Sequence, residues 1–291
     1  MKVLIIGKNS YIGKHIGQYI LNQGDQVAYI SVRDNRWKQE DFSTFDAVVF
    51  AAAIVHCKGL ADAALYDQVN TQLPREFGEK VQAQGVRKFL FLSTAAVYGA
   101  EKNLPKGCVI SKDTPLEPKD LYGKSKLKAE RLLMELASEK FSVSVIRPMN
   151  VYGKNCPGNY IASFQKLTCK LPFLPKAFTE VKQGMVHVEH LAKLCYLVLQ
   201  TNSSGIYHAQ DPEPVSSYEM MAAMAKGMNK KKKEVPCHVL VRCFSRLRLV
   251  VKLFGGVAYD QELVDCSLGS YCDKSTSEKL YEVTEKLGDC S

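Results

Sequence analysis

The chain has 291 residues, of which 46% are hydrophobic and 24% charged, and a formal net charge of +9. This composition is ordinary for a soluble globular protein, and the length allows one elaborated α/β domain or one domain plus a small lobe. No apolar run reaches the roughly 18 residues that a membrane span needs. The residues from Met1 to Gly7 are too short for a signal-peptide core, so we expect a cytoplasmic protein.

The ten cysteines are scattered without a C-x-x-C pair, which argues against a zinc ribbon and against a disulfide framework. We therefore expect free thiols in a reducing compartment. The positive charge suits a polyanionic substrate, and no motif favours nucleic acid as a partner.

The N-terminus predicts a strand, a glycine turn and a helix in direct succession. Residues 2–6 form a short apolar run that is typical of a buried parallel strand. Residues 7–13 begin and end with glycine, and helical spacing follows over 11–23. This order is the dinucleotide-binding fingerprint, in which the helix N-terminus faces a pyrophosphate.

Strands and helices then alternate, which predicts an α/β protein with a Rossmann-type, doubly wound parallel sheet. We expect the dinucleotide-binding core over 1–153, with some later segments returning to it, and a smaller C-terminal substrate lobe over 154–291. Residues 101–119 are expected as a loop over the active site. The expected strands are 26–32, 47–52, 88–92, 142–146 and 205–209, and the expected helices are 67–84, 122–139 and 191–199.

Tyr122 and Lys126 lie one turn apart on one face of the expected helix 122–139. A phenol has a pKa of about 10, and a nearby ammonium lowers that pKa by favouring the phenolate. Thr94, which follows the expected strand 88–92, can share the substrate oxygen and its proton. Hydride transfer at an alcohol carbon needs such groups, because the hydroxyl proton must move as a nicotinamide takes the hydride.

Six blocks in this order resemble the extended short-chain dehydrogenase/reductase family, in its nucleotide-sugar epimerase/dehydratase branch. Together they span roughly residues 1–220. The blocks are Gly7-x5-Gly13, Ala51–Ala53, Leu92–Gly99, Tyr122–Lys126, Arg147–Gly153 and Val186–Ala192.

The resemblance implies three catalytic residues: Thr94 as the hydroxyl, Tyr122 as the acid/base, and Lys126 as activator and ribose anchor. Asn150 would touch the sugar nucleotide together with Thr94 and Tyr122. No metal is expected, since His187 and His190 resemble a strand-to-helix junction. The implied cofactor is NAD or NADP, bound by Gly7, Asn9, Ser10, Tyr11, Ile12, Gly13, Ser31, Arg33, Ala51, Ala52, Ala53, Tyr122, Lys126 and Pro148.

Three positions depart from the family pattern. Ser10 replaces the middle glycine, which puts a side chain near the pyrophosphate and suggests an altered turn. Ser31 stands where an acidic residue usually binds the ribose 2′-hydroxyl, and with Arg33 nearby it leaves NADP open. Gln183 and Gly184 replace an Arg-Asp pair, which weakens any detailed substrate analogy.

These features predict an NAD(P)-dependent nucleotide-sugar epimerase, similar to UDP-hexose 4-epimerases, that transiently oxidises the sugar C4 hydroxyl in bacterial surface-glycan precursor synthesis. The substrate is a nucleotide-diphosphate sugar or a lipid-linked sugar, and a homodimer is left open. An NADPH-dependent 4-keto-sugar reductase is the alternative. A dehydratase is disfavoured because Ala95 and Ala96, rather than an acid/base pair, follow Thr94. A non-catalytic dinucleotide-sensing protein would have no need of Tyr122 and Lys126.

Residues 237–254 form a basic amphipathic segment in the C-terminal third. Arg242, Arg246 and Lys252 interleave with large apolar residues at roughly helical spacing. Such a segment can lie on an anionic membrane surface, here the inner face of a bacterial membrane, or pack on the substrate lobe. The preceding run, Lys230 to Lys233, reads as a solvated loop.

Overall fold

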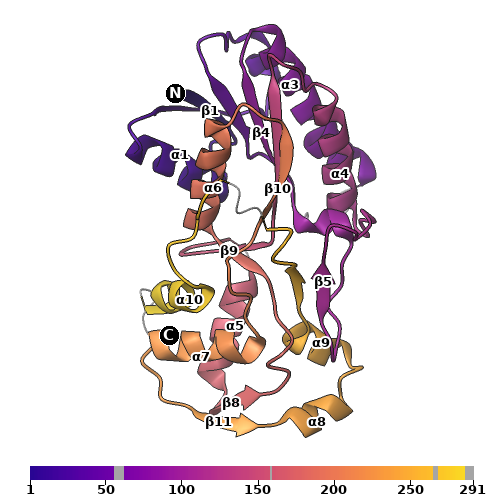
Figure 1. The fold of residues 1–291 in the computed structure, drawn as a ribbon, viewed down its shortest axis with the longest axis vertical. Coiled ribbons are helices and arrows are strands. Elements are labelled where there is room, and N and C mark those ends of the chain that lie inside the picture. Colours follow the sequence, from indigo (N-terminus) through magenta and orange to yellow (C-terminus); the bar gives the residue numbers. More distant parts are fainter. Residues whose placement is uncertain (56–61, 158, 265–267, 286–291) are drawn as a thin grey trace.

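The computed structural model describes residues 1–55, 62–157, 159–264 and 268–285. A sheet flanked by helices occupies one end of the long axis, and a smaller lobe occupies the other (Figure 1). The predicted α/β class, with a doubly wound parallel sheet, is confirmed. No helix in the described part of the chain is long and apolar enough to cross a membrane.

Six parallel strands form the sheet in the order β10-β6-β4-β3-β1-β2. All six predicted strands are present, although β2 and β3 end two residues earlier than expected, where the chain leaves the sheet to line a cavity. The strands are β1 (Lys2–Ile6), β2 (Gln26–Ile30), β3 (Ala47–Phe50), β4 (Lys88–Leu92), β6 (Ser142–Pro148) and β10 (Gly205–Ala209).

The winding of the chain reverses at β1. Ile6, the last residue of β1, lies opposite Ile30 of β2 on one side and Phe50 of β3 on the other. Open α/β sheets bind ligands at such a switch point, outside the carboxyl ends of the strands. The topology therefore places a binding crevice beside the glycine turn.

The two faces of the sheet are covered by different helices, because alternate strand residues point to opposite sides. Val3 and Ile5 pack with α1 (Tyr11–Asn22) and α6 (Val188–Gln200). Leu4 and Ile6 pack against the other layer. That layer holds α4 (Leu121–Met134) and the expected helix 67–84, which divides into the π-helical η2 (Asp67–Gln72) and α3 (Leu73–Ala83). The helix α2 (Ala63–Tyr66) directly precedes η2.

The smaller lobe has its own core, in which Met220, Met221 and Met224 are buried. The expected loop 101–119 contains a short strand, and residues 237–254 form two short helices rather than one. The remaining elements are η1 (Asn35–Gln39), η3 (Ala95–Tyr98), β5 (Cys108–Ile110) paired with β12 (Val257–Tyr259), β7 (Asn150–Tyr152) paired with β9 (Met185–His187), β8 (Phe173–Lys176) paired with β11 (Lys233–Pro236), α5 (Asn159–Lys170), α7 (Ser217–Gly227), α8 (His238–Cys243), α9 (Arg248–Phe254) and α10 (Thr276–Glu285).

The cysteines differ from the expectation at one position. Six of those in the described ranges are free thiols, whereas Cys169 is disulfide-bonded. The prediction of free thiols is therefore wrong at Cys169, because cysteine spacing alone does not reveal which cysteines pair.

Candidate active site

A cavity of about 1010 Å³ opens at the carboxyl ends of β1, β3 and β4. This is at the upper end of the usual range for small-molecule sites. Its lining runs from the glycine turn to Tyr122 and Lys126 and includes every predicted cofactor-binding residue except Gly13. Those residues are Gly7, Asn9, Ser10, Tyr11, Ile12, Ser31, Arg33, Ala51, Ala52, Ala53, Tyr122, Lys126 and Pro148.

Gly7 is required by a close approach of two backbone segments. Its φ is +111°, a conformation that other residues rarely adopt, and a Cβ added there would lie 3.1 Å from the backbone nitrogen of Ala52. A side chain there would press on the loop that follows β3. The glycine thus allows the turn and that loop to lie close together at this end of the cavity.

Ser10 caps the helix that follows the turn. Its backbone is extended, with φ −66° and ψ 126°, and its Oγ accepts a hydrogen bond from the amide of Gly13 at 3.1 Å. Because any L-residue can adopt this conformation, the serine fits at this position without backbone strain. The other free amides of the first turn are available to an anion such as a pyrophosphate.

Tyr122 lies in the first turn of α4, which Asp120 caps by accepting from the amide of Gly123 at 2.7 Å. The hydroxyl of Thr94, which follows β4, lies close enough to the phenol to affect its pKa. Burial raises the pKa of Tyr122 to about 12, while Thr94 acts in the opposite direction. At neutral pH Tyr122 is therefore a proton donor held against a second hydroxyl.

Lys126 points inward from the next turn of α4. Its Nζ donates to the carbonyl of Leu92 at 2.6 Å and lies 4.2 Å from the centre of the Phe91 ring. Burial lowers the pKa of Lys126 to about 7, an effect that Glu130 partly opposes. The lowered Tyr122 pKa that we expected from Lys126 is absent from this arrangement, because the effect of burial dominates and the ammonium is bound to the strand.

A buried ion pair fixes the strand ends beneath these residues. Arg147 contacts Glu130 at 2.6 Å, Ser93 donates a hydrogen bond to Glu130, and Arg147 donates to the hydroxyl of Tyr98 at 2.9 Å. Because Glu130 is on α4, the network joins that helix to the ends of β4 and β6. The Ser93 hydroxyl is thus bonded to Glu130, whereas the Thr94 hydroxyl is the one that affects the pKa of Tyr122.

Asn70 was missed by the sequence analysis. It is buried in the π-helical η2, bonds the amide and the carbonyl of Ile54 at 2.9 Å each, and donates to Ser125 Oγ at 3.1 Å. It therefore ties the loop after β3 to the helix of Tyr122. Single π-turns often occur at functional sites, but no sequence pattern distinguished this asparagine from an exposed helical residue.

Ser31 and Arg33 lie at the far end of the cavity, after β2, where both are exposed. The amide of Arg33 donates to Ser31 Oγ at 3.4 Å, and its guanidinium makes no ion pair with any residue that the structure describes. Asp34 also lines this end and was missed, but its carboxylate is bound to Arg36 at 2.7 Å. A free guanidinium is what a 2′-phosphate would need.

Two of the predicted substrate-binding residues do not line the cavity. Asn150 is exposed on β7, and neither Asn150 nor Thr94 lines the cavity itself. Gln183 is buried and donates to the carbonyls of Gly184 and Val257 at 2.9 and 3.0 Å. Gln183, which departs from the family pattern, therefore helps to hold residues 184 and 257 in place. The role of Asn150 in substrate binding stays a prediction.

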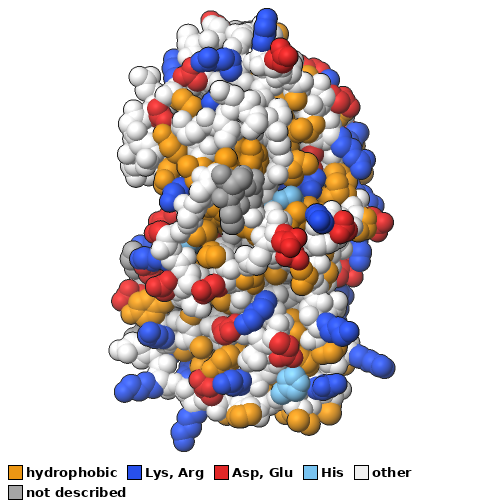
Figure 2. Space-filling view, viewed as in Figure 1, with side chains coloured by type: hydrophobic (Ala, Val, Ile, Leu, Met, Phe, Trp, Pro, Cys, Tyr) orange, Lys and Arg blue, Asp and Glu red, His pale blue; other side chains and the backbone are white. Residues whose placement is uncertain are grey.

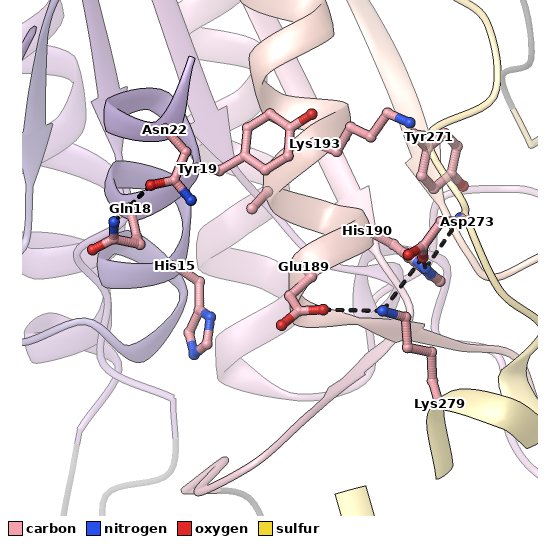
Figure 3. Close-up of a pocket in the computed structure, with 11 residues that line it drawn as sticks. His15, Gln18, Tyr19, Asn22, Glu189, His190, Lys193, Tyr271, Asp273 and Lys279 are labelled. Atoms are coloured by element: carbon pink, nitrogen blue, oxygen red, sulfur yellow. Dashed lines mark hydrogen bonds and ion pairs between the residues drawn. The ribbon is translucent and has the colours of Figure 1, made fainter. Parts of the chain in front are cut away.

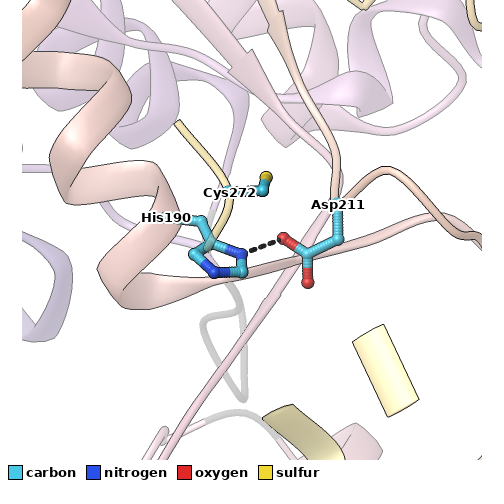
Figure 4. Close-up of side chains that lie close together, drawn as sticks. All are labelled: His190, Asp211 and Cys272. Atoms are coloured by element: carbon cyan, nitrogen blue, oxygen red, sulfur yellow. Dashed lines mark hydrogen bonds and ion pairs between the residues drawn. The ribbon is translucent and has the colours of Figure 1, made fainter. Parts of the chain in front are cut away.

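A second polar cluster joins α6 to the C-terminal part of the lobe. His190, Asp211 and Cys272 have potential ligand atoms within 4.8 Å of one another (Figure 4). The two ring nitrogens of His190, however, contact Asp211 at 2.8 Å and Asp273 at 2.5 Å. Although burial acts to lower it, these carboxylates raise the pKa of His190. Lys279 contacts Asp273 at 3.3 Å, beside a cavity of about 410 Å³ (Figure 3). Ion pairs of His190 and Lys279 with the two aspartates therefore explain why these polar side chains lie together.

Comparison with known proteins agrees with this site. The model of the NAD dependent epimerase/dehydratase family matches residues 3–209. The chain is 27% identical over 248 residues to an N-acetyl-alpha-D-glucosaminyl-diphospho-ditrans,octacis-undecaprenol 4-epimerase of Escherichia coli O157:H7, covering 79% of this chain and 73% of that protein. It is 25% identical over 295 residues to a UDP-glucose 4-epimerase of Vibrio cholerae, covering 92% and 85%.

Solved structures share the fold at low sequence identity. A UDP-N-acetylglucosamine 4-epimerase from Bacillus cereus superposes with a TM-score of 0.76 at 16% identity, covering 99% of each chain. RMD from Pseudomonas aeruginosa, complexed with NADPH, superposes with a TM-score of 0.72 at 18% identity, covering 98% of this chain and 99% of that one. At these identities the likeness supports the fold alone.

Proposed function

This chain belongs to the NAD dependent epimerase/dehydratase family, and we propose that it is a 4-epimerase of a sugar carried on a diphosphate. The observation that carries the proposal is the cavity itself. One end is formed by Gly7 and the first turn of α1, where an anion fits, and the other by Tyr122 and Lys126, where a proton can move. The residues present therefore suit a nicotinamide dinucleotide.

A bound nicotinamide would supply the hydride acceptor and donor for the sugar carbon. Tyr122 takes the proton of the C4 hydroxyl and later returns it, while Thr94, whose hydroxyl lies near the phenol, aligns the oxygen. A phenol with a pKa of about 12 needs positive charge nearby to act as a base, and Lys126 can supply part of it when protonated. Ala95 and Ala96 offer no further acid/base group, which disfavours dehydration.

The diphosphate carrier is proposed from the relatives. Their names specify UDP-glucose in one case and a diphospho-undecaprenol sugar in the other. Both substrates present two phosphates next to a hexose, and a chain with a net charge of +9 suits such an anion. A place in the synthesis of bacterial surface-glycan precursors is consistent with either carrier.

One observation favours a second candidate, an NADPH-dependent 4-keto-sugar reductase. The ribose end of the cavity carries Arg33 without an ion-pair partner among the described residues, while Ser31 replaces the usual acidic residue. This arrangement would accept a 2′-phosphate. A reductase consumes and exchanges its cofactor, whereas an epimerase regenerates its cofactor within each turnover.

The two candidates can be distinguished by incubating the purified protein with UDP-glucose and with UDP-N-acetylglucosamine. Nuclear magnetic resonance then identifies the sugar in the product. A C4 epimer formed without net cofactor consumption identifies the epimerase. Stoichiometric oxidation of NADPH with a 4-keto-sugar identifies the reductase.

Tyr122→Phe should lower either rate by about 10²–10⁴ without loss of dinucleotide binding. Tyr66→Phe is the control, because Tyr66 is a neighbouring phenol that donates to the carbonyl of Val55. Dinucleotide binding without any turnover would instead favour a sensing protein.

A further inference from the structure

The outer surface of α8, α9 and the turn between them is rich in exposed apolar side chains. We call it the α8–α9 surface. Five large apolar residues lie exposed within eleven positions of the chain. They are Val239 (78% exposed), Leu240 (64%), Phe244 (49%), Leu247 (55%) and Leu249 (67%).

The segment is nevertheless packed on its inner side. Val241, Val250 and Leu253 lie against a small core that contains Phe178 and Phe254. The two helices are therefore fixed on the lobe by one set of apolar residues while a second set faces outward. Packing on the lobe, one of the two alternatives from the sequence, therefore occurs, and it leaves other large apolar side chains of α8 and α9 exposed.

Positive charge is concentrated around the same surface. Residues 229–256 contain eight lysines and arginines but a single acidic residue, Glu234, which is a net +7 out of +9 for the whole chain. The single carboxylate is paired with Lys176 at 3.2 Å. Within the described ranges, no ion pair involves the exposed basic residues of α8, α9 and their connecting turn, which are Arg242, Arg246, Arg248 and Lys252.

Figure 2 shows basic and hydrophobic side chains side by side at the lower end of the molecule, where Figure 1 places β8, β11 and α8. The glycine turn and Tyr122 belong to the sheet half. The α8–α9 surface therefore lies at the end of the lobe, where the molecule can touch a flat surface without covering the cofactor cavity.

We propose that the α8–α9 surface binds the surface of an anionic lipid bilayer. Arginines on an interfacial helix contact lipid phosphates while leucines and phenylalanines enter the boundary between headgroups and acyl chains. A nucleic acid would use the charge but would leave five aliphatic or aromatic side chains in water. The combination of unpaired cations with exposed Leu240, Phe244 and Leu249 is what a bilayer satisfies.

The expected strength follows from the charge. Each basic residue near an anionic surface strengthens binding about fivefold, so four of them together give several hundredfold. The attraction is screened by salt, with a Debye length of about 10 Å at 0.1 M. Binding is therefore reversible and sensitive to salt and is independent of which sugar the enzyme takes.

The test is co-sedimentation of the full chain with vesicles of phosphatidylcholine alone and with vesicles that also contain phosphatidylglycerol. We expect binding only to the anionic vesicles at about 50 mM salt and its loss at about 500 mM. Arg242→Glu with Arg246→Glu should weaken binding at least about 25-fold. The matched control is Lys14→Glu with Arg131→Glu, two exposed residues of the sheet half, which should change binding little.

A second pair of variants tests the apolar part. Leu240→Ser with Leu249→Ser should also release the protein, whereas Val109→Ser, a 61% exposed residue elsewhere, should not. All of these positions are exposed, so melting temperatures should stay close to that of the wild type. Protein that remains in the supernatant with anionic vesicles at low salt overturns the proposal. So does equal loss in the control charge variant, or unchanged binding in the leucine variant, which would indicate a general polyanion surface.

Discussion

Lys126 should make the stability of the cofactor-free protein depend on pH. Its ammonium is 2% exposed, bonded to one carbonyl, and burial brings its pKa from 10.5 to about 7. Between these two values the unfolded chain binds the proton that the folded chain has lost. Stability must therefore rise with pH in this window, and the cost of burying the charge is felt in full below pH about 7.

The magnitude follows from about 1.36 kcal/mol for each pH unit. Because Lys126 is already about half deprotonated at pH about 7, the wild type should gain about 2 kcal/mol from pH about 7 to pH about 9 relative to Lys126→Met, which carries no titrating group. For a chain of 291 residues this corresponds to about 4 °C in melting temperature. The variant also loses the hydrogen bond to the Leu92 carbonyl, which lowers its free energy of unfolding by an amount that does not depend on pH. Only the change in the stability difference between pH about 7 and pH about 9 therefore tests the pKa of Lys126.

Differential scanning calorimetry of both proteins at the two pH values measures this difference. Lys124→Met serves as the control, because Lys124 is exposed on the same helix and should leave the pH dependence unchanged. If the gap in melting temperature between wild type and Lys126→Met stays constant with pH, the ammonium is not desolvated as the packing indicates.

Other variants test the turn, the missed asparagine and the ribose end. Ser10→Ala should lower stability by about 1 kcal/mol in urea titrations and Ser10→Gly by only a few tenths, because the cap accepts from the Gly13 amide. Asn70→Ala should cost at least about 3 kcal/mol, since it leaves both backbone groups of Ile54 without this partner; a smaller loss would mean that water replaces it. Arg33→Ala should weaken NADPH about 10–100-fold in calorimetric titration and leave NADH unchanged; equal effects on both would remove Arg33 from cofactor discrimination.

Much of the fold could be predicted because each level of the sequence agreed with the next. The run Lys2–Ile6, the glycine turn and the helical spacing after it all indicate one strand, turn and helix, and the structure has them within a residue. The positions of Tyr122, Lys126 and Thr94 were equally predictable, because the first two are local to one helix and Thr94 follows strand β4. Their catalytic role stays a prediction. Local order and spacing are the properties that a sequence displays directly.

The missed features all depend on contacts between distant segments. Asn70 matters because it contacts Ile54 and Ser125, which lie far from it in the sequence. No spacing rule predicts contacts of this kind. Asp211 and Asp273 lie far in sequence from His190, which they hold between them. The effect of burial on Tyr122 likewise could not be predicted from the neighbouring Lys126, since desolvation is a property of the packed site.

The buried pair of Tyr122 and Lys126 suggests why this site needs its cofactor to act. Burial opposes both charged forms that the chemistry uses, raising the pKa of the phenol to about 12 and lowering that of the amine to about 7. A neutral pair costs the folded protein less than a phenolate beside an ammonium would in the same apolar surroundings. Ligand atoms that accept hydrogen bonds from Lys126 would favour its charged form, and a charged Lys126 would then favour the phenolate of Tyr122. The two groups are thus expected to ionise together when the site is filled, which makes proton transfer depend on a bound dinucleotide.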